Sequence, residues 1–246
     1  MVASILIACV LSVIFIGVRI TVATKNVQGG IVGVLIKTLA SLSVVAIAIT
    51  AIYMGGKTRT GVQNTSIFIV AGLVCGLIGD IVLDLKWVYQ KSKEEALYLT
   101  GGMISFAIGH IMYFVAILLY LGTSVISWKV VGICVAVSAV VAFSIIFIGE
   151  KLLKFKFGKF IIHSVAYAFL LIFMMSIGIS AWILGAEINS HVSIFGIGMI
   201  LFFLSDLVLT QMYFGGRPND RTLCVINHAL YYSAQIFIAA FTFFMV

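Results

Sequence analysis

Four ionisable side chains lie inside stretches of the chain that are otherwise apolar: Lys37, Asp80, His110 and Asp206. A charged group at the centre of a bilayer costs about 2.5–3.5 kcal/mol even on the mildest insertion scale, so such groups mark a functional site by default. Two carboxyl groups and an imidazole can donate and accept protons, which is the chemistry of general acid–base catalysis. The alternative is a buried polar network that only fixes how the helices pack.

Other polar residues are spaced so that they share a helix face. His110 and Tyr113 are three residues apart, and Tyr231 and Gln235 are four apart, as neighbours on one face of a helix are. Tyr167 likewise follows a histidine by four residues. We therefore expect these side chains to face the interior, although Gln235 could instead only hydrogen-bond one helix to another.

Some of these polar residues also have simpler interpretations. We expect Asp84, close to Lys86 near the end of an apolar stretch, to reach the membrane surface. His163 and His228 could lie at the level of the lipid headgroups. The spacing of paired histidines in known zinc sites is absent, so we predict no metal and no cofactor.

The composition determines what kind of elements must position these groups. The 246 residues are 63% hydrophobic and include a single proline. Only 9% of them are charged, which is too few to cover a water-facing surface. We predict an all-α, polytopic membrane bundle in one domain, residues 1–246, which makes it a multi-pass integral membrane protein. Its eight transmembrane helices are expected near 2–21, 31–54, 65–86, 98–121, 127–149, 158–184, 191–213 and 222–246.

The basic residues orient this bundle. Lys37 aside, we assign the fourteen lysines and arginines to the loops and the span ends beside them. Eleven of them, Arg19 included, belong to the first, third, fifth and seventh loops. Because positive loops stay cytoplasmic, both termini are predicted outside. The net charge of +7 follows from this topology and gives no reason to expect a nucleic-acid partner. At 1.5 Å per residue, Lys37, Asp80, Asp206 and Tyr231 then lie roughly 9–14 Å below the cytoplasmic surface, which predicts one polar cavity open to that leaflet.

Five short motifs together resemble a known family. They are Gly79-Asp80-x-x-Leu83, Gly109-His110-x-x-Tyr113, Tyr167 with Met174 or Met175, Phe203-Leu204-Ser205-Asp206, and Tyr231-Tyr232-Ser233-Ala234-Gln235. In this order they look like the YhhN family of eight-span membrane proteins, which includes the lysoplasmalogenases. One departure is the second span, where the family usually has Lys-Pro-Leu and this chain has Lys37-Thr38-Leu39.

The resemblance implies a hydrolase that cleaves the vinyl ether of lysoplasmalogen to a fatty aldehyde and a glycerophospho-ethanolamine or glycerophospho-choline. Such a site needs a protonated carboxyl group and a second carboxylate or histidine, for which Asp80, Asp206 and His110 are the expected catalytic residues. The expected substrate-binding residues are Lys37, Tyr113, Tyr167, Ser205, Tyr231 and Gln235. The partners would be a lysophospholipid and membrane lipid, in the plasma membrane of a bacterium or an endoplasmic-reticulum-type membrane of a eukaryote. The alternatives are a proton-coupled transporter and a non-catalytic lipid-binding protein.

Overall fold

The computed structural model describes residues 2–22, 30–55, 60–89, 95–218 and 220–245, and in these ranges the chain is helical with short connecting turns. The helices are α1 (Val2–Val22), α2 (Gly30–Gly55), α3 (Thr60–Val88), α4 (Glu95–Leu121), α5 (Trp128–Lys151), α6 (Ile161–Gly185), α7 (Val192–Phe214) and α8 (Arg221–Phe241). Each of these eight is long and apolar enough to cross a membrane. The predicted all-α, eight-span architecture is therefore confirmed.

The helix boundaries differ from the predicted spans at several ends. The third helix begins at Thr60, five residues before the predicted span, and the eighth ends at Phe241, five residues before its predicted end. The sixth begins at Ile161, after a short 3-10 turn, Gly158–Phe160. An apolar stretch marks the hydrocarbon layer, whereas a helix continues until its backbone is capped or turns, so the two need not coincide.

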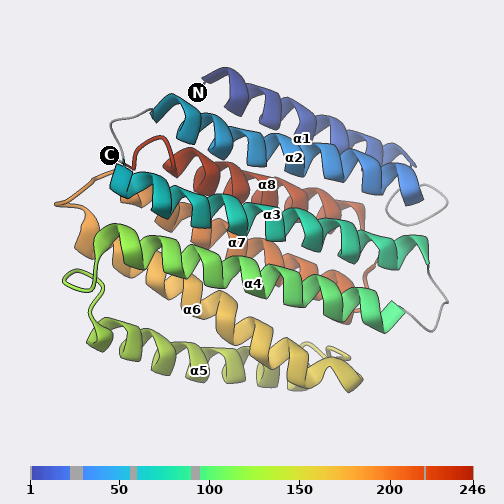
Figure 1. Ribbon diagram of the computed structural model, residues 1–246. Coiled ribbons are helices and arrows are strands. Elements are labelled where there is room, and N and C mark those ends of the chain that lie inside the picture. Colours follow the sequence, from blue (N-terminus) through green and yellow to red (C-terminus); the bar gives the residue numbers. More distant parts are fainter. Residues whose placement is uncertain (1, 23–29, 56–59, 90–94, 219, 246) are drawn as a thin grey trace.

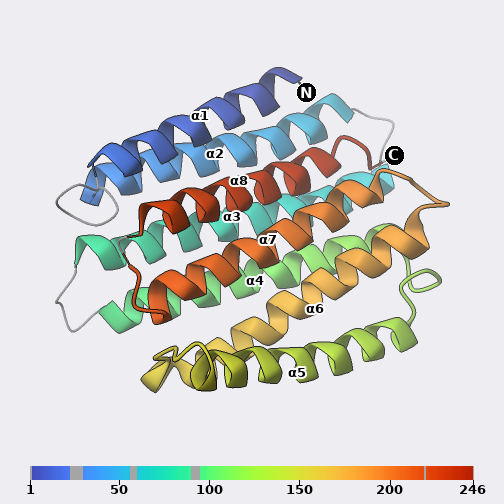
Figure 2. The ribbon, with the colours of Figure 1, turned by 180° about the vertical axis from the view of Figure 1, so that it is seen from behind.

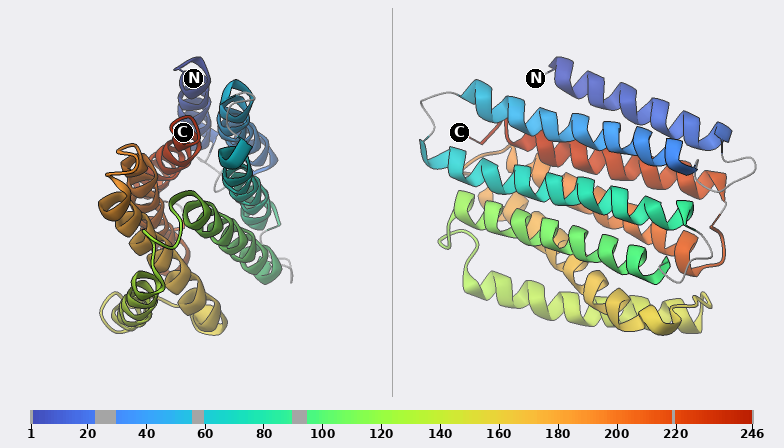
Figure 3. Two further views of the ribbon diagram at one scale, coloured as in Figure 1. Left: turned by 60° about the vertical axis from the view of Figure 1, so that its left-hand side comes forward. Right: turned by 45° about the vertical axis from the view of Figure 1, so that its right-hand side comes forward.

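The helices form a ring to which one helix is attached from outside. Along the ring, α1 packs on α2, α2 on α3, and α3 on α4, while α8 packs on α7 and α7 on α6. Contacts of α1 with α8 and of α4 with α6 close the ring, and α5 packs against α6 on its outer side. Figure 1 shows α1, α2, α3 and α4 as one row, and Figure 2 shows α8, α7 and α6 as a second row behind it. The left view of Figure 3 looks along the helices, with the two rows on opposite sides.

Both ends of the described chain lie at the same end of the bundle (Figure 1). This follows from an even number of spans and agrees with the predicted placement of both termini on one side of the membrane. Which side that is remains a prediction from the loop charges.

Glycines allow α3 and α4 to approach closely where the site begins. A Cβ atom on Gly72 would lie 2.9 Å from the carbonyl oxygen of Gly109, and one on Gly109 would lie 2.9 Å from the carbonyl oxygen of Gly72. The Phe106 ring fills the place of a side chain at Gly79, where a Cβ would meet it at 2.9 Å. Small residues of this kind let membrane helices gain van der Waals contact that lipid cannot supply. The contact fixes against α4 the turn of α3 that carries Gly79 and, next to it, Asp80.

Candidate functional site

Four buried charged side chains from α1, α2 and α3 form one ion-pair network. The ammonium group of Lys37 lies 3.1 Å from Asp80 Oδ1 and 3.1 Å from Asp84 Oδ1. The Arg19 guanidinium lies 3.1 Å from Asp84 Oδ2. None of the four residues is more than 6% exposed. With two cations and two carboxylates, the network is neutral when all four groups are charged, which is the condition for burying charges at tolerable cost.

Two expectations from the sequence are wrong at this network. Asp84 does not reach the membrane surface, since it is 3% exposed and paired with Arg19 and Lys37. Arg19, which we counted among the loop cations, is 1% exposed inside α1. The physical reason is shared: each residue is close to a helix end along the sequence, but a neighbouring helix covers it and supplies the opposite charge.

Hydroxyl groups complete the coordination of Asp80. Its Oδ2 atom accepts hydrogen bonds from Ser41 Oγ at 2.6 Å and from the Tyr231 hydroxyl at 2.8 Å. The Tyr231 hydroxyl accepts a hydrogen bond from Gln235 Nε2 at 2.9 Å, and Tyr113 donates to Gln235 Oε1 at 3.4 Å. Tyr231 thus contacts Asp80 directly, whereas Gln235 and Tyr113 are joined to Asp80 only through hydrogen bonds that lead to Tyr231. Ser41 was not predicted, although it follows Lys37 by four residues and so shares its helix face.

His228 belongs to the same network. Its Nε2 atom lies 2.7 Å from Arg19 Nη1, and its Nδ1 atom lies 2.7 Å from the carbonyl oxygen of Cys224. Because a guanidinium can only donate, Nε2 accepts, and Nδ1 carries the proton that it donates to the carbonyl. The residue is 3% exposed, which excludes the headgroup-level interpretation. His163 is exposed and lies outside this network.

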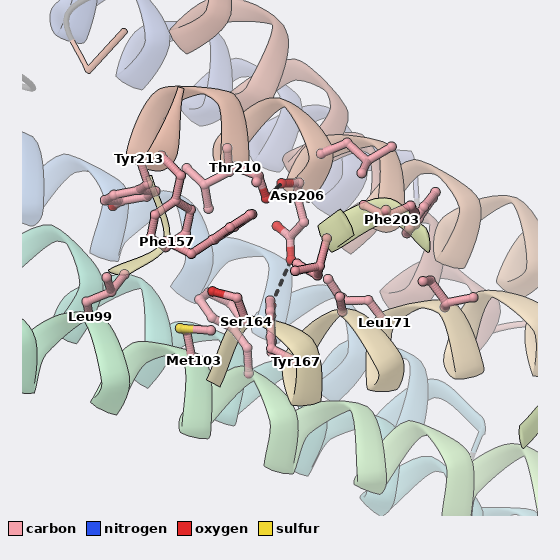
Figure 4. A pocket seen from close by; sticks show the side chains of 18 of the residues that line it. Leu99, Met103, Phe157, Ser164, Tyr167, Leu171, Phe203, Asp206, Thr210 and Tyr213 are labelled. Atoms are coloured by element: carbon pink, nitrogen blue, oxygen red, sulfur yellow. Dashed lines mark hydrogen bonds between the residues drawn. The ribbon is translucent and has the colours of Figure 1, made fainter. Parts of the chain in front are cut away.

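Asp206, on α7, is placed differently from Asp80. Its Oδ2 atom accepts a hydrogen bond of 2.7 Å from the Tyr167 hydroxyl of α6, drawn as a dashed line in Figure 4. No lysine, arginine or histidine of the described residues forms an ion pair with it. Ser205, the neighbouring predicted binding residue, uses its hydroxyl on the Phe202 carbonyl of its own helix. Asp206 is thus a buried carboxyl group that receives a hydroxyl hydrogen bond and, among the described residues, is paired with no cation.

The two aspartates line one small cavity. It leaves about 20 Å³ for the centres of water-sized molecules, which is enough for about one water. Its walls include all four residues of the ion-pair network and Asp206. Lys37, Asp80, Asp206 and Tyr231, which were expected at one depth, thus line the same cavity, and its opening to the cytoplasmic leaflet stays a prediction.

A larger cavity lies on the other side of Asp206, between α4, α5, α6 and α7 (Figure 4). It leaves about 80 Å³ for the centres of water-sized molecules, and its walls are mostly apolar. Both cavities share Asp206, Leu83, Phe106, Leu209 and Tyr213. Asp206 therefore stands between an apolar cavity on one side and a charged cavity on the other.

His110 is not brought into either of these two cavities. Its Nδ1 atom lies 2.9 Å from the carbonyl oxygen of Phe106, one turn earlier in α4. Its ring packs edge-on against Phe202 at 4.6 Å, and Phe202 and Phe106 both pack against Tyr231. The His110 ring also packs against Tyr113, and no hydrogen bond or ion pair among the described residues joins His110 to the two aspartates. The catalytic role expected for His110 stays a prediction that this geometry does not support.

Among the described residues, no three histidine, cysteine, aspartate or glutamate side chains gather as metal ligands would. The comparisons with known proteins give one match: the model of the YhhN family matches residues 32–242, which include both aspartates and the residues around them except Arg19. No curated protein and no solved structure matches the chain.

Proposed function

The chain belongs to the YhhN family, and from this premise we propose that it is a membrane-embedded hydrolase of lysoplasmalogen. It would cleave the vinyl ether bond and release a fatty aldehyde and a glycerophospho-ethanolamine or glycerophospho-choline. The observation that carries the proposal is the position of Asp206 between an apolar cavity and a water-sized charged one. Its carboxyl group is buried, and no cation in the described part of the chain pairs with it. A vinyl ether needs these two surroundings together, a proton donor beside its apolar chain and a water molecule nearby.

Charge balance assigns the roles of the two aspartates. Asp80 lies in a network whose two carboxylates are matched by two cations, and it accepts two hydroxyl hydrogen bonds in addition. Those contacts stabilise it as a carboxylate. A third carboxylate at Asp206 would leave one buried negative charge uncompensated, which is costly. We therefore assign the proton-carrying carboxyl group to Asp206 and the permanent carboxylate to Asp80.

The reaction then proceeds in three steps. Asp206 transfers its proton to the β-carbon of the vinyl ether, forming a C–H bond and leaving an oxocarbenium ion next to two carboxylates. Water from the small cavity attacks the oxocarbenium carbon and returns one proton to Asp206. The resulting hemiacetal loses the glycerol oxygen as an alcohol and becomes the aldehyde. Preformed negative charge beside the developing cation lowers the barrier, as electrostatic preorganisation does in other enzymes.

The surrounding residues hold these groups in place. Tyr167 fixes the orientation of the Asp206 carboxyl group, and Tyr231 and Ser41 fix that of Asp80. Lys37 is bound to two carboxylates, so its role here is to keep Asp80 ionised, and it could in addition attract the phosphate of the substrate. The apolar walls of the larger cavity would receive the reacting end of the alkenyl chain and exclude bulk water.

The proposal is tested with purified protein in liposomes that contain lysoplasmalogen, by measuring aldehyde release. Saturated alkyl-ether and acyl analogues are the substrate controls, since neither has the vinyl ether bond. Asp206→Asn and Asp80→Asn are each expected to lower turnover by at least about 100-fold. Glu187→Gln, the same change at an exposed acid, should leave it unchanged.

The two aspartate variants should differ in stability. Asp206→Asn replaces one neutral group by another and should melt close to the parent, whereas Asp80→Asn unbalances the buried charges and should melt lower. Normal turnover by Asp206→Asn would remove Asp206 from the mechanism. Absence of aldehyde with the parent protein would refute the proposed activity.

A further inference from the structure

One polar atom in the larger cavity has no hydrogen-bond partner among the residues that the structure describes. Ser164, in the first turn of α6, is 6% exposed and lines the cavity with its side chain. No hydrogen-bond partner for its Oγ atom lies among the described residues. A buried hydroxyl group without a partner costs free energy that folding does not recover. Such a group is explained if a bound molecule supplies the missing hydrogen bond.

Several other hydroxyl groups inside this bundle are satisfied by their own helix. Ser12 donates to the carbonyl oxygen of Ala8 at 2.7 Å, Ser138 to that of Cys134 at 2.6 Å, and Ser205 to that of Phe202 at 2.7 Å. Thr210, which lines the same cavity, donates to the carbonyl oxygen of Asp206 at 2.8 Å. This is the usual solution for serine and threonine in apolar helices. Ser164 departs from it at a position that faces a cavity.

Ser164 lines the same cavity as Asp206, the proposed proton donor. It precedes Tyr167 by three residues, so the two side chains share one face of α6, and Tyr167 is hydrogen-bonded to Asp206. Figure 4 shows Ser164 and Tyr167 together on α6 with Asp206 opposite. Ser164 lies closer than Tyr167 to the beginning of α6 at Ile161. At 1.5 Å per residue, the three residues from Ser164 to Tyr167 span about 4.5 Å along the helix axis. In the orientation predicted from the loop charges, the beginning of α6 is its cytoplasmic end.

The order of these groups matches the order of atoms in a single-chain ether lipid. From the chain towards the headgroup, such a lipid has the vinyl ether carbons, the ether oxygen, one carbon, and then the carbon that bears the glycerol 2-hydroxyl. With the vinyl ether at Asp206, the 2-hydroxyl would lie nearer the membrane surface by the ether oxygen and two glycerol carbons. Ser164 lies on that side of Tyr167. A hydroxyl group can both donate and accept, so it satisfies a serine without needing a charge.

We propose that Ser164 is a specificity-determining residue that binds the free 2-hydroxyl of a single-chain glycerophospholipid in the larger cavity. This inference rests on the proposed function for the position of the vinyl ether. A lipid that carries a second acyl chain has no hydroxyl group at this position. Ser164 thus selects lipids with one chain over those with two.

Binding, measured apart from turnover, tests this role. The probes are a saturated 1-O-alkyl glycerophosphoethanolamine, which the proposed reaction cannot cleave, and its 2-deoxy counterpart, each titrated into purified protein. The parent should bind the hydroxyl lipid about tenfold more tightly, the effect of one hydrogen bond worth about 1.4 kcal/mol. Ser164→Ala should bind both lipids equally and as weakly as the parent binds the 2-deoxy lipid. Ser164→Thr should keep the preference.

Ser138→Ala is the matched control, because it removes a buried hydroxyl group that is already satisfied within α5. It should keep the tenfold preference. Without lipid, Ser164→Ala should melt no lower than the parent, whereas a serine with a structural role would lose stability on removal. If Ser164→Ala keeps the preference, or loses affinity for both lipids alike, the inference is wrong while aldehyde release by the parent still supports the proposed function. A parent that neither binds the two lipids nor cleaves lysoplasmalogen refutes both.

Discussion

Removing one partner of the buried Arg19–Asp84 pair should destabilise the protein far more than removing both. Arg19 is 1% exposed and Asp84 is 3% exposed, and each belongs to the neutral network with Lys37 and Asp80. Arg19→Met leaves a net charge of −1 in that network, and Asp84→Asn leaves +1. An uncompensated buried charge costs about 3–5 kcal/mol. For a chain of this length each kcal/mol corresponds to about 2–4 °C in Tm, so either single variant should melt roughly 6–20 °C below the parent.

The double variant Arg19→Met with Asp84→Asn restores neutrality. The Lys37–Asp80 pair at 3.1 Å remains, and the amide oxygen introduced by Asp84→Asn can still accept a hydrogen bond from the lysine. Replacing both members of a buried pair is often close to neutral. We therefore expect the double variant to melt above both single variants. Since it then costs less than either single change, the coupling energy in the double-mutant cycle should be at least about 3 kcal/mol.

The assay is thermal unfolding of the purified protein in detergent, read by the loss of a monodisperse peak after heating. Arg217→Met is the control, because Arg217 is 3.9 Å from Asp220 in an exposed pair and should be worth no more than about 1 kcal/mol. The reasoning is refuted if Asp84→Asn melts with the parent, as a surface aspartate would. It is equally refuted if the two single effects simply add in the double variant.

Two further predictions concern the proton donor and the orientation of the bundle. Tyr167→Phe removes the hydroxyl that orients Asp206 and should lower turnover about tenfold at unchanged Tm. Tyr120→Phe, at the other end of the bundle, is the control and should leave turnover unchanged. If Tyr167→Phe turns over as fast as the parent, the hydrogen bond from Tyr167 to Asp206 does not serve the reaction. In a background without the native cysteines, a cysteine at exposed Ser190 should be labelled by a membrane-impermeant thiol reagent added outside intact cells and one at exposed Lys159 should be spared. The reverse pattern would invert the predicted topology.

The architecture of this protein could be predicted from the sequence because a bilayer imposes it directly. A chain that must satisfy its backbone in hydrocarbon forms helices of about 20 apolar residues, so eight apolar stretches predict eight spans. The same reasoning singled out Asp80 and Asp206, since an ionisable group in an apolar span is costly wherever it points. The structure places both on one cavity.

The sequence could not predict which side chains surround these aspartates. Depth along a helix can be counted from its ends, but which neighbour a residue faces depends on how the helices rotate and pack. For that reason Asp84 and Arg19 were expected near the surface and are buried as a pair. His110 was expected beside the aspartates and instead packs against Phe202 and Tyr113.

Ser41 and Ser164 show the same limit for residues without charge. A serine in an apolar helix carries no sign of its role, because most satisfy themselves on their own backbone. Tertiary packing directs Ser41 to Asp80 and leaves Ser164 in a cavity, with no hydrogen-bond partner among the described residues. The sequence by itself therefore determined the spans and their costly ionisable groups, which depend on each helix and the bilayer alone. Only the tertiary structure decided charge pairing, cavity walls and the unpaired hydroxyl, because these arise where separate helices meet.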